Sequence, residues 1–445
     1  MATSSSMCVD LLGKSALMSW WHGRGSLLDY SNPDAVKWWH EQMDKALSTG
    51  IDGWKCDGTD PYILEVVDAR GHSGHVSYRN YADHYYGDFF DHTRAVRGKD
   101  ALIMSRPVDV FGPLFFRFSP KRVMFSGWVG DADPTFSGLI STLKRYLQSA
   151  WDGYANFGSD IGGYRTGNGT LGRTKELFIR WAQLGAFSPL MENGGDKEHR
   201  PWMFDSDGST LIEDTYRDLV ETHYQLVPYL LTTGTLAYNH SRSSLMPLAP
   251  HQDFVDKLID EFNPPTYNYM LGPDILVAPI TSDPAQVSVT FPQISTKSNG
   301  GDGGGGGGVD EKDTYVAWWN RSLTYRAGDT AEFHNVSLDV FTVFHRTGSL
   351  FPLRPAVMAS HQPFSNKPRT DVLELHVYNP TATSPFPVQV VTNDDRPGLV
   401  AAYWRDPLPK STGRHGLNSS GIHFTITAHP TLSVSIHVHF GHSNT

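Results

Sequence analysis

Three acidic residues in the first half of the chain, Asp57, Asp131 and Asp160, each come after a short apolar run of the kind that forms a buried strand. An ionised carboxylate can act as a nucleophile. A carboxyl group against an apolar wall can act as a general acid, because burial raises its pKa. The residue types therefore allow nucleophilic or acid–base chemistry on a polar substrate.

Two of these carboxyl groups have neighbours that suit such chemistry. Lys55 precedes Asp57 by two residues, so both side chains lie on one face of a strand, and a nearby cation keeps a carboxylate ionised. Trp128 provides an apolar wall close to Asp131. The structural alternatives are a salt bridge at a strand end for the first pair and a helix cap for the second. Asp133 fits such a cap better than Asp131, because a proline follows it directly.

Further polar residues also follow predicted strands. Arg106 comes after the run of residues 101–104, and its alternative role is an ion pair at the rim of a barrel. Asp160 lies among glycines and could bind sugar hydroxyls or close a turn, and His199 lies in a polar loop after a predicted strand. No spacing of histidines and carboxylates resembles a metal site, and no Gly-x-Ser-x-Gly elbow occurs. We therefore expect no cofactor and no metal.

The elements that must position these residues alternate between short apolar runs and helical patterns. Strands are predicted at residues 51–56, 101–104, 122–128, 154–157 and 186–191, and helices at residues 32–50, 134–150 and 174–185. Such alternation favours a parallel sheet, and polar residues at strand ends are typical of the catalytic face of a (β/α)8 barrel. Because about five strand–helix units are recognised, residues 1–247 are expected to form an incomplete barrel, about strands 4 to 8.

The pattern changes after Pro247, where short β-type runs replace helical periodicity. Residues 248–355 are predicted to form a proximal antiparallel β-sandwich, and residues 356–445 a distal one. The glycine-rich stretch at residues 299–308 is expected to be a flexible surface loop. The predicted fold class is therefore α/β plus all-β, with a partial TIM barrel followed by one or two sandwiches.

Composition excludes several classes of protein. The 445 residues are 39% hydrophobic, which suffices for a large core, and the net charge of −10 comes without a basic stripe for nucleic acid. The sequence contains no run of 18 apolar residues, so no segment is predicted to insert into a membrane. The two cysteines, Cys8 and Cys56, can build neither a disulfide framework nor a cysteine-based metal site. The oligomeric state and the compartment stay open.

Two opposed carboxyl groups on one barrel face are what glycoside hydrolysis requires. With the groups about 5–5.5 Å apart, one attacks the anomeric carbon while the other protonates the leaving oxygen, and configuration is retained. A carbohydrate is accordingly the expected partner.

Several segments resemble glycoside hydrolase family 31, and they occur in the family's order. Residues 53–58, Gly-Trp-Lys-Cys-Asp-Gly, resemble its nucleophile motif, and residues 128–131, Trp-Val-Gly-Asp, resemble its acid/base motif. Weaker matches are the strand end at residues 105–106 in reversed order, the Asp-Ile-Gly-Gly segment at residues 158–163, the next helix and strand at residues 176–191, and two sandwich segments at residues 271–279 and 346–352.

The resemblance implies a retaining α-glycosidase that hydrolyses O-glycosyl bonds of terminal α-linked sugars, with Asp57 as nucleophile and Asp131 as general acid/base. It also implies that the subsite for the non-reducing sugar is lined by Lys55, Arg106, Trp128 and Asp160. A lysine next to the nucleophile resembles the α-xylosidase-like members more than the α-glucosidases.

The sequence departs from the family in two places. The usual Arg-x-His is here Met191-Glu192-Asn193-Gly194, and His199 is the expected replacement for the missing histidine. The family's N-terminal sandwich and first barrel strands are not recognised, so a C-terminal portion of such an enzyme is expected. The alternatives are a catalytically inactive, carbohydrate-binding remnant and a chain whose open barrel exposes strand edges and aggregates.

Overall fold

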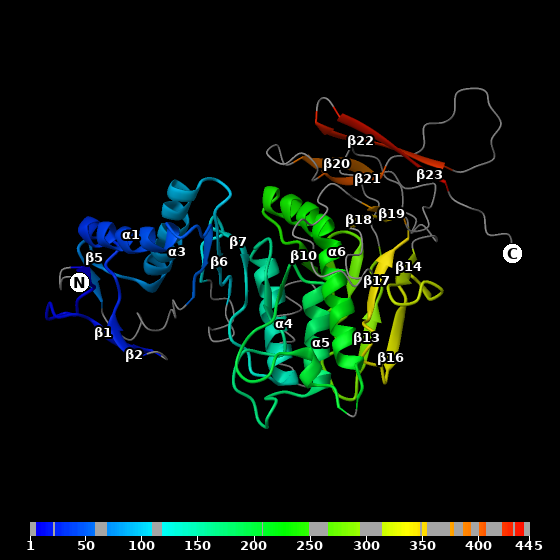
Figure 1. Ribbon diagram of the computed structural model, residues 1–445, viewed down its shortest axis with the longest axis horizontal. Coiled ribbons are helices and arrows are strands. Elements are labelled where there is room, and N and C mark those ends of the chain that lie inside the picture. The colour runs from blue at the N-terminus through cyan, green and yellow to red at the C-terminus, as the bar shows by residue number, and fades with distance from the viewer. Residues whose placement is uncertain are drawn as a thin grey trace, which may run out of the picture. The chain divides into compact units, whose positions relative to one another are not determined.

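The computed structural model describes residues 6–20, 23–57, 69–108, 118–206, 208–248, 266–293, 314–347 and 349–353, and five strands between residues 374 and 439 (Figure 1). Contacts divide the chain into two compact units. Unit 1 contains Met1–Arg173, Ser188–His199 and Ser241–Ser243, and unit 2 contains Thr174–Phe187, Arg200–His240 and Ser244–Thr445. The described part of the chain contains no helix that is long and apolar enough to span a membrane.

Unit 1 contains a series of parallel strands. They are β3 (Gly53–Lys55), β6 (Leu102–Ser105), β7 (Met124–Gly127), β8 (Gly158–Asp160) and β9 (Leu190–Glu192). The pairs β3–β6, β6–β7 and β8–β9 are parallel, and a parallel bridge between Trp128 and Gly158 connects β7 with β8. All five carboxyl ends therefore lie at one edge, as the alternating pattern predicts.

Glycines allow these strands to approach closely. A Cβ added to Gly53, Gly127 or Gly158 would overlap a backbone carbonyl of the neighbouring strand. Only glycine fits where two backbones meet in this way. The strand predicted at residues 154–157 begins later, at Gly158, because the hydrophobic run lies before the residues that pair. The last predicted strand, at residues 186–191, likewise shrinks to Leu190–Glu192.

Among the described residues of this unit, the helices that accompany the strands are α1 (Pro33–Leu47), α3 (Tyr78–Arg97) and α4 (Phe136–Trp151). Asn32 caps α1 as predicted, with its side-chain oxygen accepting a hydrogen bond from the Asp34 amide at 3.0 Å. The prediction that Asp133 caps α4 is wrong, because the helix starts two residues beyond Pro134 and Thr135 provides the cap. Asp133 instead forms an ion pair with Arg165 at 3.1 Å.

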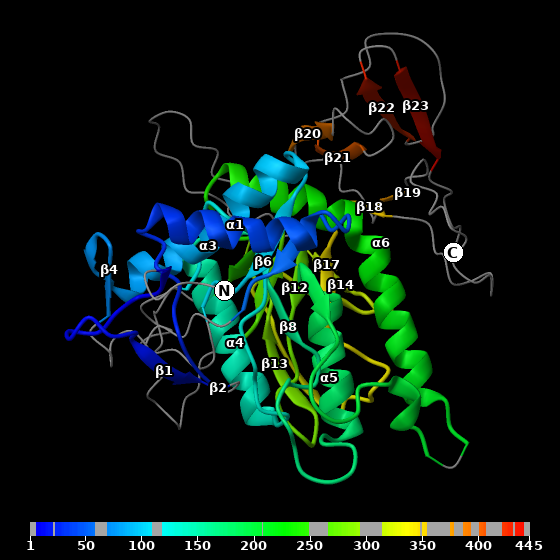
Figure 2. The same ribbon diagram turned by 60° about the vertical axis from the view of Figure 1, so that its left-hand side comes forward.

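Helices α1 and α3 lie side by side (Figure 2). His40 bonds Asp88 of α3, and His92 bonds Asp44 of α1, both at 2.7 Å. The two imidazole rings stack with their centroids 3.8 Å apart. Below them, the apolar faces of both helices pack against β6 in a core that includes Met43, Leu47, Tyr86, Phe89 and Ile103.

The N-terminal part of the unit adds two antiparallel hairpins, β1–β2 (Leu17–Trp20, Gly23–Ser26) and β4–β5 (Arg70–Gly71, Gly74–His75).

Unit 2 begins with α5 (Lys175–Ala186) and α6 (Leu211–Asn239), separated by the short 3-10 helix η2 (Pro201–Met203). Phe178 of α5 stacks on Phe204 and on Tyr216 of α6, with ring centroids 4.6 and 5.4 Å apart. Helix α6 and the earlier α3 have no counterpart among the predicted helices. Pro228 lies inside α6, where a proline argues against a helix, and polar residues are interspersed among the apolar residues of α3.

The β part of unit 2 contains a six-stranded antiparallel sheet in the order β10-β11-β12-β17-β14-β15 and a separate pair, β13–β16. The strands are β10 (Leu245–Pro247), β11 (Tyr269–Leu271), β12 (Ile275–Val277), β13 (Gln286–Thr290), β14 (Thr314–Ala317), β15 (Thr324–Arg326), β16 (Thr330–His334) and β17 (Val343–Arg346). Val289 and Phe291 pack with Leu276, Tyr315 and Phe344 in one apolar core, which joins the sheet to the pair.

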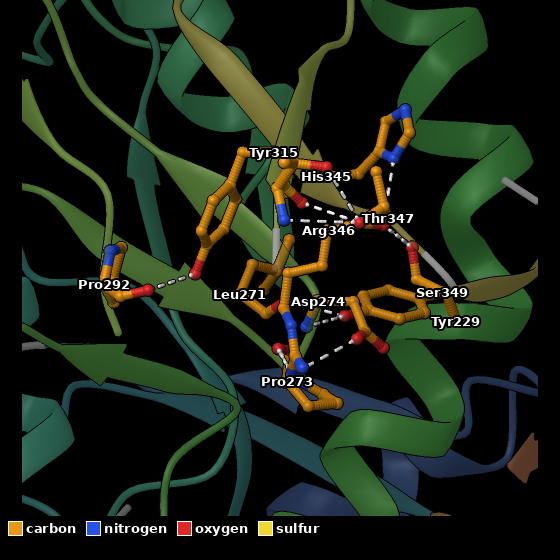
Figure 3. A network of polar contacts seen from close by, with 11 residues as sticks. Tyr229, Leu271, Pro273, Asp274, Pro292, Tyr315, His345, Arg346, Thr347 and Ser349 are labelled. Carbon is orange, nitrogen blue, oxygen red and sulfur yellow. Dashed lines mark hydrogen bonds and ion pairs between the residues drawn. The ribbon is translucent and has the colours of Figure 1, made fainter. Parts of the chain in front are cut away.

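A polar network ties α6 to this sheet (Figure 3). The Tyr229 hydroxyl donates to the Leu271 carbonyl at 2.8 Å, and Arg346 forms an ion pair with Asp274 at 3.8 Å. Because Asp274 and Arg346 are both almost fully buried, each must be satisfied by a protein partner. Tyr315, which is opposite Arg346 in the register of β14 and β17, donates to the Pro292 carbonyl at 3.1 Å.

The remaining strands form antiparallel pairs: β18 (Leu350–Leu353) with β19 (Glu374–Val377), β20 (Phe386–Thr392) with β21 (Val400–Arg405), and β22 (Gly421–His429) with β23 (Leu432–His439). The alternating pattern predicts β19, β20, β22 and β23, and β21 is an addition. The glycine-rich stretch at residues 299–308 lies outside the described residues.

Candidate active site

The candidate site lies at the carboxyl edge of the parallel strands of unit 1. Lys55, Asp160 and Glu192 end strands β3, β8 and β9, while Arg106 and Trp128 directly follow β6 and β7. The register places Asp160 opposite Glu192. The edge thus gathers side chains that are far apart in the sequence.

One guanidinium contacts both candidate catalytic carboxylates. Arg106 Nη2 forms an ion pair with Asp57 Oδ1 and a second with Asp131 Oδ1, the latter at 3.1 Å. The Arg106 side chain is 6% exposed, whereas Asp57 and Asp131 remain 43% and 27% exposed. Two oxygens that share one nitrogen lie close together, and both carboxylates keep a face toward solvent. The ion pair weighed as the alternative role of Arg106 therefore exists, and it joins the two carboxylates.

Lys55 has a different partner from the expected one. Its Nζ forms an ion pair with Glu192 Oε1 at 2.5 Å, and it lies 4.3 Å from the centroid of the Trp128 ring. Arg106 lies over the same ring at 4.9 Å. The expectation that Lys55 is the cation next to Asp57 is corrected, since Arg106 makes that contact. Both cations thus lie over the buried indole ring, an arrangement that is favourable for cation–π attraction.

Asp160 is a buried carboxyl group at the end of β8. It is 2% exposed, and neither of its oxygens has a hydrogen-bond partner among the described residues. Burial, and then the nearby charge of Glu192, raise the pKa of Asp160 to about 8, against a lowering by Lys55. Asp160 therefore holds its proton at neutral pH in the absence of a ligand.

The main chain at Asp57 is held by a partly buried tyrosine. The Tyr85 hydroxyl donates to the Asp57 carbonyl at 2.7 Å, and burial raises the pKa of Tyr85 well above its ordinary value. Cys56 is buried next to it, and desolvation raises the pKa of its thiol, so this cysteine is not a nucleophile at neutral pH. The hydrogen bond from Tyr85 therefore fixes the main chain that carries the Asp57 side chain.

Arg173 joins the two loops that follow β8 and β9. It donates to the carbonyls of Gly162 at 3.0 Å and Asp196 at 2.7 Å, and it also bonds the Glu198 carbonyl. A single arginine thereby connects the loop after Asp160 to the loop that carries the predicted His199.

His199 is placed in that second loop. Its Nδ1 lies 2.9 Å from Asn193 Oδ1, and its Nε2 is buried without a partner among the described residues. Burial, helped by Arg173, lowers the pKa of His199 to about 4, so the imidazole is neutral at pH 7. The described contacts do not connect His199 to Asp57, Asp131 or Lys55, and its role in sugar binding stays a prediction.

Two residues of the edge were not among the predicted site residues. Glu192 was recognised only as a departure from the family pattern, although it ends a strand as the predicted site residues do. Tyr164 is the second: burial and the charges of Asp131 and Asp160 raise its pKa. Tyr164 does not directly follow a predicted strand, so the strand-end pattern did not mark it as a site residue. The described residues contain no group of three or more metal-ligating side chains that could hold an ion.

Comparison with known proteins identifies the family of the chain. Residues 3–233 match the profile described as "Glycosyl hydrolases family 31 TIM-barrel domain". The chain belongs to glycosyl hydrolases family 31.

Among curated relatives of this family 31 chain, the "Alpha-xylosidase" of Emericella nidulans is 26% identical over 75% of the chain and 39% of that protein. The "Neutral alpha-glucosidase C" of Mus musculus is 26% identical over 76% of the chain and 35% of that protein. The "Sulfoquinovosidase" of Escherichia coli is 27% identical over 61% of the chain and 39% of that protein. The chain thus spans well under half the length of these relatives.

Solved structures show the same fold. The cycloalternan-forming enzyme of Listeria monocytogenes, in complex with a pentasaccharide substrate, superposes with a TM-score of 0.67 at 23% identity and covers 89% of this chain and 35% of that one. A family 31 dextranase of Flavobacterium johnsoniae has a TM-score of 0.67 at 19% identity, covering 87% and 45%. The matched profile and these superpositions show that the chain contains the TIM-barrel domain fold of the family.

Proposed function

We propose that this chain carries the catalytic residues of a retaining α-glycosidase, with Asp57 as nucleophile and Asp131 as general acid/base. The observation that supports this most directly is the shared contact of both carboxylates with Arg106 Nη2. The proximity suits the separation of about 5–5.5 Å that retaining enzymes use.

The proposed reaction has two displacements. In the first, an Asp57 oxygen forms a bond to the anomeric carbon, the glycosidic C–O bond breaks, and the Asp131 carboxyl gives its proton to the leaving oxygen. In the second, Asp131 takes a proton from water, the water oxygen attacks the anomeric carbon, and the bond to Asp57 breaks. The sugar leaves with its original configuration, and both carboxyl groups regain their starting states.

Arg106 and Trp128 support this chemistry. The buried Arg106 side chain contacts both carboxylates and so fixes their positions. Trp128 supports the Lys55 and Arg106 cations beside the sugar, while Asp160 offers unpaired oxygens to the hydroxyl groups.

We also propose the domain arrangement that the sequence suggests. Residues 1–247 would form the later part of a (β/α)8 barrel, residues 248–355 a proximal sandwich and residues 356–445 a distal one. The five parallel strands of unit 1 support the first part. The six-stranded sheet and the β13–β16 pair, which share one apolar core, support the second.

The substrate class is a terminal α-linked sugar. Relatives named for α-xylosides, α-glucosides and sulfoquinovosides match the chain with nearly equal identity, so their names do not choose among these sugars. The lysine next to the nucleophile favours the α-xylosidase-like members.

The test compares turnover of aryl α-glycosides by the wild type and by Asp57→Asn. We expect turnover to fall on the order of a thousandfold or more, because the neutral amide cannot attack the anomeric carbon. Asp91→Asn is a matched control, since Asp91 also pairs with an arginine, at 2.9 Å, but outside the site.

Product analysis by NMR should show the α-anomer first. Near-normal activity of Asp57→Asn, or a first-formed β-anomer, would contradict the proposal. Saccharide binding by the wild type without release of reducing sugar would instead support the non-catalytic, carbohydrate-binding alternative.

A further inference from the structure

Three buried carboxylate oxygens at the edge of β8 and β9 have no hydrogen-bond partner among the described residues. They are both oxygens of Asp160 and Oε2 of Glu192. The two residues are opposite each other in the parallel register, so their side chains lie on the same face of the strand pair. Because a buried polar atom without a partner is costly, this pair is prepared to form hydrogen bonds with a ligand, with Glu192 Oε2 as an acceptor.

The cation that contacts this pair is already neutralised. Lys55 Nζ lies 2.5 Å from Glu192 Oε1 and rests over the Trp128 ring. Glu192 therefore uses one oxygen to hold Lys55 and leaves the other for a ligand. An anionic ligand that approaches Lys55 would have to compete with Glu192 and face two carboxyl groups.

We propose that Glu192 determines the sugar specificity of the site: with Asp160 it selects a sugar that presents hydroxyl or amino donors, and it excludes a sugar that carries a carboxylate or sulfonate. This inference rests on the proposed function, because it assigns a role within the same sugar-binding edge. Glu192 stands where the family resemblance leads one to expect an arginine, so the role is particular to this chain.

The selection has two physical sources. Hydroxyl and ammonium groups satisfy the unpaired Oε2 of Glu192, whereas a carboxylate or sulfonate has no proton to donate and leaves this oxygen unpaired. Like charges brought together at a binding site also oppose association directly. Removal of the Glu192 charge should release Lys55, and a free ammonium group would then attract the anion that the wild type excludes.

The experiment uses three ligands that differ in one group at C6 of the same sugar. They are methyl α-glucoside, its 6-amino-6-deoxy analogue and methyl α-glucuronoside, titrated against the full chain by calorimetry or ligand-observed NMR. For the wild type we expect the neutral and amino sugars to bind at least about tenfold more tightly than the carboxylate sugar. This comparison depends on no variant.

Two variants then test the role of Glu192. In Glu192→Gln we expect the preference against the carboxylate sugar to shrink by about tenfold, and in the double variant Lys55→Met with Glu192→Gln we expect this gain to disappear. Glu213→Gln is the matched control, because Glu213 also pairs with a cation at 2.5 Å, but on the surface of α6. Melting temperatures close to that of the wild type confirm that each variant is folded.

The outcomes separate the two proposals. If the wild type binds the carboxylate sugar as tightly as the neutral one, or if Glu192→Gln leaves the preference unchanged, the specificity role is wrong while the proposed function stands. A gain that persists without Lys55 also overturns it. If no sugar binds to the wild type, the proposed function fails, and the inference that rests on it fails with it.

Discussion

At the scale of single residues, ion pairs determine the positions of the charged side chains in the candidate site. Arg106 contacts Asp57 and Asp131, and Lys55 contacts Glu192, so each cation holds acidic partners in place. Asp160 stands apart, because it is buried and no described residue bonds its carboxyl oxygens. A carboxyl group in that setting retains its proton until the pH is well above the usual range for aspartate.

This raised pKa predicts how stability depends on pH. The Asp160 pKa is about 8 in the folded chain and about 3.9 in an unfolded one. Between these values the folded chain binds a proton that the unfolded chain has released, so the free energy of unfolding falls as the pH rises through this window. In Asp160→Asn this decline should be smaller, and urea titrations at several pH values measure it.

The exposed Asp52 provides the comparison for that measurement. Asp52→Asn makes the same chemical change in a side chain that is 72% exposed. We expect the decline of stability with pH to match that of the wild type. An equally steep decline in Asp160→Asn would show that another group causes it.

At the scale of elements, close approach of the strands positions the site. Gly127 at the end of β7 is directly opposite Ser105 at the end of β6. Arg106 follows Ser105, and Trp128 follows Gly127. The register between β6 and β7 therefore sets how Arg106 and Trp128 face each other. A side chain at this point would force the two backbones apart.

We predict that Gly127→Ala destabilises the chain, because its Cβ would overlap the Ser105 carbonyl and the Met124 side chain. The expected loss is about 1–3 kcal/mol in the free energy of unfolding, measured by urea titration. Gly194→Ala is the control, since a Cβ there meets no atom within 4 Å. Equal stability of the two variants would mean that β6 and β7 do not pair in this register.

At the scale of the whole molecule, charged groups inside each unit connect segments that are distant in the sequence. In unit 2, Arg180 of α5 is almost fully buried and donates to the carbonyls of Ser337 at 3.2 Å and Val340 at 3.0 Å. It also bonds the Val336 carbonyl. Burial lowers the pKa of Arg180 to about 10, which leaves it charged at neutral pH.

Arg180→Met should therefore lower the free energy of unfolding by about 2–4 kcal/mol, because several buried carbonyls lose their donor. Thermal melting and urea titration measure the loss. Arg217→Met is the matched control in the same unit. Its ion pairs with Glu213 and Asp214 lie on the surface of α6, and such pairs contribute less than about 1 kcal/mol. A loss in Arg180→Met no larger than in this control would contradict the structural role of Arg180.

The sequence by itself determined the family and the order of the parallel strands with their polar ends. Hydrophobic periodicity is a local property, so α1, α4 and α5 were predicted within a few residues. Motifs such as residues 53–58 and 128–131 are also local, and they identified Asp57 and Asp131 as candidates before any distance was known.

Only the tertiary structure decided which charges meet. Lys55 lies two residues from Asp57, yet its partner is Glu192, 137 residues further along the chain, because β9 follows β8 at the same edge. The start of β8 was misplaced for the same reason, since backbone pairing depends on neighbours that are remote in sequence. Pairing between remote groups depends on the geometry of the assembled sheet, which a local pattern of residues does not contain.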